Sequence, residues 1–245
     1  MARRNLGDVL HYFISEEEQR EARGAAHARE RPVQASPARA PRYCLPGESE
    51  RPLTCSLALE LACGMTTELR GARVLSSFPL SPLLPRVPSV RWEASDDLAA
   101  ALTAVPSDQP TIVVERASRL GALLRRLSEH ALDGVVLPVE AAAWGIGKAL
   151  GFLRELAPAL ANRRVLGLII GAGTPSAAAD LLAVLAAAAR RQHGVEIELL
   201  GQLARDPESY RSLLRGESLH ALGAESETAQ SLRSLCQRLS HRLAA

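Results

Sequence analysis

A polar loop that leads into an apolar helix is the stretch of this chain with the clearest potential for chemistry. It runs from Gly47 to Ala62 and reads GESERPLTCSLALELA. Such a loop binds phosphate when glycines turn its backbone N–H groups inward, a lysine reaches the phosphates and a Ser or Thr hydroxyl holds Mg²⁺. This loop has a single glycine, two carboxylates and a proline without an N–H, and the only lysine, Lys148, is far away in sequence. The residue types therefore predict a loop that has lost phosphate binding.

The same stretch resembles the phosphate-binding loop and first helix of the ParA/MinD family of ATPases. That family writes the region as G-K-G-G-x-G-K-T-T, then A-N-L-A-L-A-L-A, then G-x-R-V-L-L-x-D. Here SLALELA matches the family helix, and GARVLSSFP, from Gly71 to Pro79, matches the next strand. With Gly47 placed on the first family glycine, Thr54 is kept at one of the two hydroxyl positions. The later loop positions fall on residues without the family's chemistry: Glu48, Ser49, Glu50, Arg51, Pro52 and Leu53.

Two further positions of the resemblance concern the metal and the base. The family ends one buried strand in an Asp that acts through Mg²⁺, and here the run TIVVE ends in Glu115. The family ends a later strand in an Asn that reads adenine, and here Gly171 holds that place. A glutamate can still ligate Mg²⁺, but without the loop lysine we expect Glu115 to be structural. Because the chain departs from the family pattern at these positions, we expect no catalytic residue, no metal site and no cofactor.

The order of apolar runs predicts the elements that would position these residues. Strand-like and helix-like segments alternate from about Arg42 to Leu243, which indicates an α/β fold with a doubly wound, mostly parallel sheet and helices on both faces, as in P-loop NTPases. Continuous apolar runs are typical of parallel strands buried on both faces. We expect the strands at Thr111–Glu115, Gly134–Val139 and Arg164–Ile170 to be adjacent, and Val195–Leu203 to be an edge strand. The other expected strands are Tyr43–Leu45, Val74–Phe78 and Val90–Glu93.

Helices are expected between these strands. One runs from Asp96 to Val105, with Ser95 or Asp96 as its N-cap. The polar stretch from Pro46 to Pro52 is expected to be a loop. The remaining expected helices are Leu53–Ala62, Leu120–His130, Trp144–Leu160, Ser176–Arg191, Asp206–Arg215 and Thr228–Leu243.

A short N-terminal segment stands apart from this domain. Residues 1–19 carry an apolar stripe at helical spacing, residues 20–41 read as a flexible linker without large apolar side chains, and residues 42–245 form the α/β domain. A tethered amphipathic segment is a common form of docking peptide, although it can also pack back on its own domain. The candidate partner-binding residues are Leu6, Val9, Leu10, Tyr12, Phe13 and Ile14.

Composition excludes several classes of function. A net charge of +2 and scattered Arg pairs favour neither a nucleic-acid nor a membrane partner. The four cysteines show no C-x-x-C pair and no companion His spacing, so neither a zinc site nor a disulfide framework is expected. We find no signal peptide and no apolar run long enough to span a bilayer, and we expect a cytoplasmic protein without stable membrane insertion.

These observations lead to a functional hypothesis. We expect a non-catalytic pseudo-ATPase, an adaptor or regulatory protein that binds partners in the positioning or assembly of a cellular machine. Its N-terminal segment would contact a protein partner, and its α/β domain is a candidate for a homodimer or heterodimer contact. Two alternatives stay open: a MinD/ParA-type ATPase that binds ATP through an altered loop, and a RecA-like accessory protein.

Overall fold

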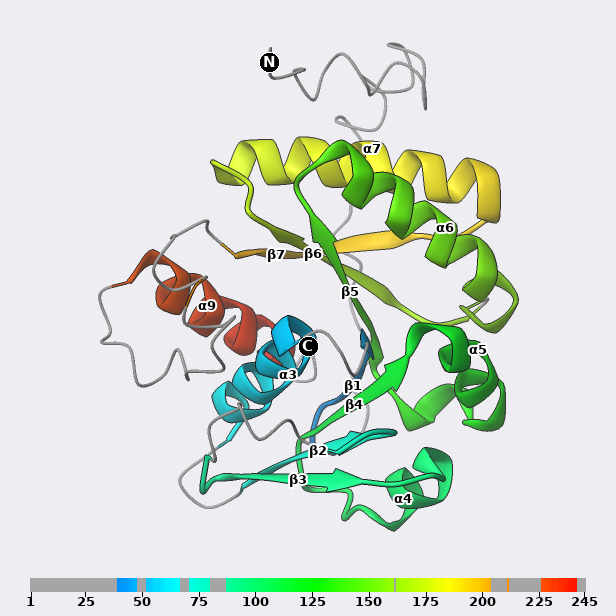
Figure 1. Cartoon of the computed structure of the whole chain (residues 1–245), viewed down its shortest axis with the longest axis vertical. Helices are drawn as coiled ribbons and strands as arrows, with labels where there is room; N and C mark the ends of the chain where they lie inside the picture. Colours follow the sequence, from blue (N-terminus) through cyan, green and yellow to red (C-terminus); the bar gives the residue numbers. More distant parts are fainter. Residues whose placement is uncertain are drawn as a thin grey trace.

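A seven-stranded parallel sheet forms the centre of the protein in a computed structural model (Figure 1). The structure describes residues 39–47, 52–66, 71–79, 87–160, 162–203, 211 and 226–241. The predicted N-terminal segment, the linker up to residue 38 and the helix expected at Asp206–Arg215, apart from Arg211, lie outside these residues. The strands are β1 (Arg42–Gly47), β2 (Ala72–Ser76), β3 (Val90–Ala94), β4 (Thr111–Arg116), β5 (Gly134–Glu140), β6 (Val165–Ile170) and β7 (Ile197–Leu203).

The strands lie in the order β3-β2-β4-β1-β5-β6-β7, and every pairing is parallel. The predicted doubly wound parallel sheet is thereby confirmed, with β7 at one edge as expected. The expectation that β4 and β5 are adjacent is wrong, because β1 lies between them and pairs with both. An apolar run shows that a strand is central but carries no information about its neighbours.

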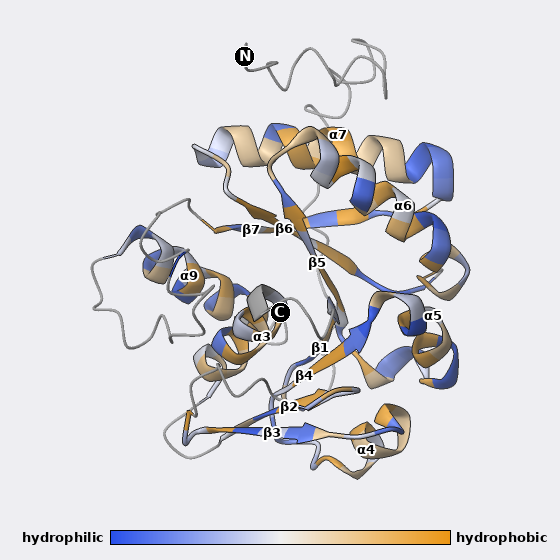
Figure 2. Cartoon of the chain, viewed as in Figure 1, coloured by the Kyte–Doolittle hydropathy of each residue, from blue (hydrophilic) through white to orange (hydrophobic). Residues whose placement is uncertain are grey.

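Helices cover both faces of the sheet. One face carries α4 (Leu98–Ala104), α5 (Ala117–Arg126), α6 (Ala143–Leu160) and α7 (Pro175–His193), and the other carries α3 (Pro52–Gly64) and α9 (Glu227–His241). Each strand alternates its side chains between the two cores: Cys44 faces the first group of helices, and its neighbours Tyr43 and Leu45 face the second. The apolar residues in Figure 2 follow the sheet and the helix faces that pack on it.

Local corrections to the expected boundaries have simple physical causes. Asp97 caps α4, rather than Ser95 or Asp96, because its carboxylate accepts hydrogen bonds from the backbone N–H groups of Ala99 and Ala100, both at 3.1 Å. The helix expected at 120–130 starts earlier and ends earlier, at Arg126, and a 3₁₀ turn, Glu129–Ala131, follows. The Arg163 guanidinium donates to the carbonyls of Leu124 and Leu127 at the end of α5, which satisfies groups that the ended helix leaves open.

Tyr43 ties the first strand to the last helix. Its side chain is 2% exposed, and its hydroxyl donates a 3.0 Å hydrogen bond to the carbonyl of Leu239 in α9. On the same side, Cys236 of α9 packs against the Glu60 and Leu61 carbonyls of α3. Helix α9 is therefore part of the α/β domain, and it closes the core on the face that α3 begins.

Candidate functional site

A pocket opens at the carboxyl edge of the sheet, where the chain changes direction. From β1 the chain crosses one face through α3 to β2, whereas from β4 it crosses the other face through α5 to β5. In open α/β sheets the crevice at such a point is the usual place for a ligand. The cavity here has a volume of about 150 Å³. It is lined by Pro46, Gly47, Thr54, Ala117, Leu137, Pro138, Glu140, Trp144, Gly145, Lys148, Ala149, Phe152 and Ile170.

The wall from β1 and α3 includes Gly47 and Thr54, two residues that the resemblance assigns to a phosphate loop. Gly47 is the last residue of β1, so the expected loop begins later than Pro46, and Pro52 is the first residue of α3. A Cβ on Gly47 would lie 2.6 Å from Cγ1 of Val114 in the neighbouring strand. Gly47 is thus required by close packing between β1 and β4, which explains the glycine without any phosphate.

The opposite wall comes from β5 and the start of α6. Gly145 is buried, and a Cβ there would collide with the carbonyl oxygen of Glu140. The backbone N–H of Ala142 donates to that same carbonyl at 2.7 Å, which closes a tight turn between strand and helix. This close approach sets α6 directly over the end of β5 and brings Trp144 and Lys148 to the pocket.

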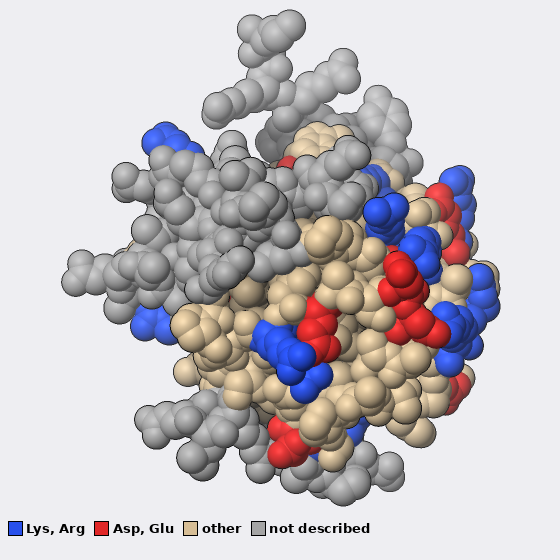
Figure 3. Space-filling view, turned by 60° about the horizontal axis from the view of Figure 1, so that its bottom comes forward, with Lys and Arg blue, Asp and Glu red and all other residues tan. Residues whose placement is uncertain are grey.

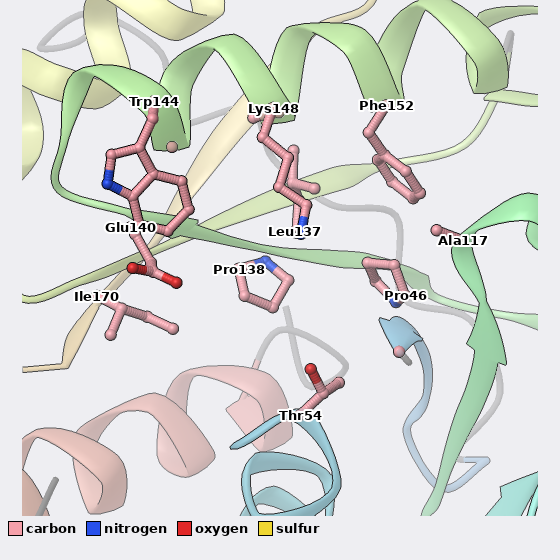
Figure 4. A pocket seen from close by; sticks show the side chains of 13 residues that line it. Pro46, Thr54, Ala117, Leu137, Pro138, Glu140, Trp144, Lys148, Phe152 and Ile170 are labelled. Atoms are coloured by element: carbon pink, nitrogen blue, oxygen red, sulfur yellow. The ribbon is translucent and has the colours of Figure 1, made fainter. Parts of the chain in front are cut away.

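Figure 4 shows how the polar side chains are arranged around the cavity. Lys148 extends from α6 into the pocket, and Thr54 points toward it from the opposite side, at the start of α3. The Glu140 carboxylate lies below the indole of Trp144 on another side of the same pocket. The rest of the wall is apolar apart from backbone groups, so a cation, an anion and one hydroxyl share an otherwise hydrophobic site.

The residues predicted for the degenerate nucleotide site divide into four groups. Gly47 and Thr54 line the pocket, whereas Glu115 and Gly171 do not. Pro52 and Leu53 begin α3. The four residues in between, Glu48, Ser49, Glu50 and Arg51, lie outside the described part of the chain.

Glu115 is buried at the end of β4 and is engaged by the protein itself. Its side chain is 4% exposed, and its Oε1 atom accepts a hydrogen bond from the Ser77 hydroxyl at 2.5 Å and another from the Arg116 backbone N–H at 2.7 Å. These bonds join the ends of β2 and β4 and hold the carboxylate away from the pocket. The arrangement fits the structural role expected for Glu115.

Gly171 makes the turn that follows β6. Its φ of 82° lies in the left-handed region that favours glycine, and its N–H donates to the carbonyl of Leu203 at 3.0 Å. Gly171 does not line the pocket and has no side chain that could read a base there.

Sequence reasoning missed three residues of the site: Glu140, Trp144 and Lys148. Lys148 is distant from Gly47 in sequence, but β5 lies next to β1, and α6 starts where β5 ends. Trp144 is 56% exposed, and it is the exposed large hydrophobic side chain of the described residues. One signal in the sequence could have indicated this wall. A tryptophan stands just after a predicted strand, and the one lysine of the sequence follows four residues later.

The cysteines are reduced in the described structure, and three of them are buried. Burial raises the pKa of Cys44, with a smaller contribution from the Glu115 charge, and burial also raises the pKa of Cys55 to about 11. The pKa of Cys236 is raised to about 12, mainly by burial. Cys63 is only half-buried and is the thiol most open to reagents.

Charges of both signs are mixed on the surface that the described residues form (Figure 3). Figure 3 shows basic and acidic side chains interspersed on one face, and ion pairs such as Arg73–Glu93 and Arg126–Asp97 join the two signs. No group of three or more metal-ligating side chains occurs among the residues described. In the part of the chain that the structure describes, no helix is long and apolar enough to cross a bilayer.

Comparison with known proteins rests on structure alone. No model of a protein family matches the sequence, and no curated protein matches it either. Among solved structures, MinD in the MinC:MinD cell division complex of Aquifex aeolicus aligns with a TM-score of 0.50 and 15% identity over 82% of this chain and 95% of that chain. A ParA family ATPase from Chlorobium tepidum aligns with a TM-score of 0.50 and 14% identity, covering 82% of this chain and 99% of that chain.

The cell division ATPase MinD of Pyrococcus furiosus aligns in the same way. Its TM-score is 0.50 and its identity 14%, with 82% of this chain and 98% of that chain covered. Such low identities establish the architecture and leave the chemistry to the residues of the site. The chain has the fold of the MinD and ParA ATPases.

Proposed function

We propose that this protein is a non-catalytic adaptor or regulatory protein on a MinD/ParA-like scaffold, which binds protein partners in the positioning or assembly of a cellular machine. The observation that carries the proposal is the state of Glu115. Its carboxylate stands at the end of β4, where the resemblance places the Mg²⁺ residue, yet it is 4% exposed and bonded to Ser77 and Arg116. A carboxylate used in this way holds two strands together and is not presented to a metal–nucleotide complex.

The pocket itself supports the same conclusion. Pockets for drug-sized ligands measure about 300–1,000 Å³, whereas this cavity measures about 150 Å³. Pro46 and Gly47 form its wall on the β1 side, and Gly47 packs against Val114. A triphosphate needs a cradle of inward backbone N–H groups with a lysine, and the sequence that follows Gly47 supplies two glutamates and a proline instead.

The partner contact is proposed to lie in the N-terminal segment. Leu6, Val9, Leu10 and Phe13 form an apolar stripe, joined by Tyr12 and Ile14, ahead of a linker that offers nothing to bury it. Leaving such a stripe in water costs about 1.5–3 kcal/mol per large side chain, so a partner groove is a favourable cover. One of the similar solved structures is a complex of MinC with MinD. We propose that this chain also binds a protein partner, but not that it binds MinC.

One observation favours the alternative of an ATPase with an altered loop. Lys148 reaches the pocket that Gly47 and Thr54 line, so a lysine is present near the place of the lost loop lysine (Figure 4). In this second candidate function, Lys148 would bind the phosphates from α6 instead of from the loop. The structures compared above are MinD and ParA ATPases, and they favour both of these interpretations over a RecA-like accessory protein.

Isothermal titration of the full-length protein with ATP and Mg²⁺ tests the proposal. We expect no binding in the micromolar range. Micromolar binding would overturn the pseudo-ATPase assignment, and its loss in Lys148→Met, but not in the exposed control Arg154→Met, would establish the alternative. A pull-down with the full-length protein beside a form lacking residues 1–40 tests the partner contact, which should be lost with the segment.

A further inference from the structure

Glu140 is the charged group of the pocket that the described residues leave for a ligand. It is half-buried at the end of β5, and among the described residues no hydrogen bond or ion pair engages its carboxylate. Lys148, the other charged group of the lining, already interacts with another group of the protein. Taking an unpaired carboxylate partly out of water is unfavourable, so the pocket favours a positive charge beside Glu140.

An aromatic ring lies next to this carboxylate. Figure 4 shows the Trp144 indole above the Glu140 carboxylate, and both side chains line the same cavity. The indole is 56% exposed, so a ligand can still cover part of the ring. The ring quadrupole attracts a cation, and tryptophan is the best ring for this contact. The carboxylate and the indole therefore both select a cationic group at one place.

The backbone that carries these two side chains is held without a ligand. Glu140 pairs with Ile170 in the neighbouring strand, and its carbonyl accepts a hydrogen bond from the Ala142 N–H at 2.7 Å. Gly145 lets α6 approach that same carbonyl closely, which sets Trp144 over the end of β5. Little ordering is then required when a ligand binds, which favours affinity.

The rest of the lining suits a compact apolar body. Leu137, Pro138 and Phe152 line the same cavity and can pack against hydrocarbon. A cavity of about 150 Å³ lined by aliphatic and aromatic side chains holds a body the size of benzene, and this pocket has the same volume. A benzyl group has that bulk, whereas a nucleotide is much larger.

Lys148 restricts the ligand to a single charge. Its ammonium repels a cation anywhere in the cavity except close to Glu140, where the carboxylate outweighs the repulsion. A monoamine can keep its charged end at Glu140 and its apolar end elsewhere. A diamine would bring a second cation toward Lys148.

We propose that this pocket binds a small primary amine in its ammonium form, with a compact apolar body such as a benzyl group. The ammonium lies between the Glu140 carboxylate and the Trp144 indole, and the body lies against Leu137, Pro138 and Phe152. The inference goes beyond the proposed function. It does not depend on the N-terminal contact, because every residue involved belongs to the α/β domain.

Titration of the full-length protein with three probes of equal shape tests the charge. The probes are benzylamine, which is a cation at neutral pH, benzyl alcohol, which is neutral, and benzoate, which is an anion. We expect benzylamine to bind and to change the tryptophan fluorescence, and each of the other two to bind at least tenfold more weakly. The Trp144→Phe variant should lose most of the fluorescence change while Trp92 is retained.

Three variants assign the contact to its side chain. Glu140→Gln should weaken benzylamine at least tenfold, and its melting curve shows whether the fold is kept. Lys148→Met should bind benzylamine at least as tightly as the wild type, because the variant removes a repulsive charge. Glu155→Gln is a matched control on the exposed side of α6 and should bind benzylamine within twofold of the wild type.

Several results would overturn the inference. The absence of saturable benzylamine binding at millimolar concentration ends it, and this arm needs no variant to fold. Benzyl alcohol that binds as tightly as benzylamine shows an apolar cavity without selection for charge. Benzoate that binds more tightly than benzylamine shows an anion site at Lys148. A folded Glu140→Gln protein that binds benzylamine like the wild type places the ligand elsewhere. Binding of ATP, by contrast, contradicts the proposed function and leaves the benzylamine result to stand by itself.

Discussion

Replacing Gly145 by alanine should destabilise the protein, whereas the same change two residues later should stabilise it. A Cβ at Gly145 would collide with the carbonyl oxygen of Glu140. That oxygen already accepts a hydrogen bond from the Ala142 N–H, so it cannot move aside without breaking the bond. At Gly147 nothing lies within 4 Å of an added Cβ. The pair therefore isolates the close contact that places α6 over the pocket.

The magnitudes follow from two opposing effects. Gly→Ala inside a helix favours folding by about 1 kcal/mol, and overpacking a tight contact costs about 3 kcal/mol at the upper end of its usual range. Gly145→Ala should then be about 2 kcal/mol less stable than the wild type, which corresponds to a melting temperature about 4–8 °C lower. Gly147→Ala should melt about 2–4 °C higher. The helix-propensity gain is common to both variants, so their difference measures the contact.

Thermal melting followed by circular dichroism, together with urea titration, gives both values. If Gly145→Ala is as stable as Gly147→Ala, the turn from β5 to α6 is not as close as described, and the placement of Trp144 and Lys148 over the pocket loses its basis. Gly151→Ala provides a second control, since its added Cβ also meets nothing within 4 Å.

Three further predictions concern the core, the N-terminal segment and the thiols. Val113→Asp should unfold the domain, because Val113 is fully buried in β4 and an unpaired core carboxylate costs several kcal/mol of a total stability of about 5–15 kcal/mol. The control Ala94→Asp, at an exposed position on the sheet edge, should change the free energy of unfolding by less than about 0.5 kcal/mol. Unchanged melting of the Val113→Asp protein would contradict the strand assignment. The double change Leu10→Ala and Phe13→Ala should abolish co-purification of the partner with the melting temperature nearly unaltered, and a fall of many degrees would mean that the segment belongs to the core. Iodoacetamide should label Cys63 much faster than the three buried thiols, since their raised pKa values leave little thiolate; mass spectrometry that finds a buried cysteine labelled first would refute this.

Many elements of the fold could be predicted from the sequence, because their signals are local. Runs such as TIVVE and GVVLPV are apolar on both faces, which central parallel strands require, and both are strands in the structure. Asp97 shows the limit of local reasoning, since several neighbouring Ser and Asp residues can cap a helix, and only the backbone path decides which one does.

The N-terminal segment remains a prediction from sequence. Its apolar stripe and the linker behind it lie outside the described residues, so the experiments on Leu10 and Phe13 decide its role. The residues after Gly47 stay a prediction as well. Their types are facts of the sequence, but residues 48–51 lie outside the described part of the chain.

The sequence by itself determined that the stretch after Gly47 contains neither a second glycine nor a lysine before α3, because residue types can be read from one short stretch. It also determined the α/β class, through the alternation of apolar periods. Only the tertiary structure decided that β1 lies between β4 and β5, that Glu115 turns to Ser77, and that Lys148 reaches the end of β1. The physical reason is that strand order is set by the packing of distant crossovers and helices, which no local pattern records.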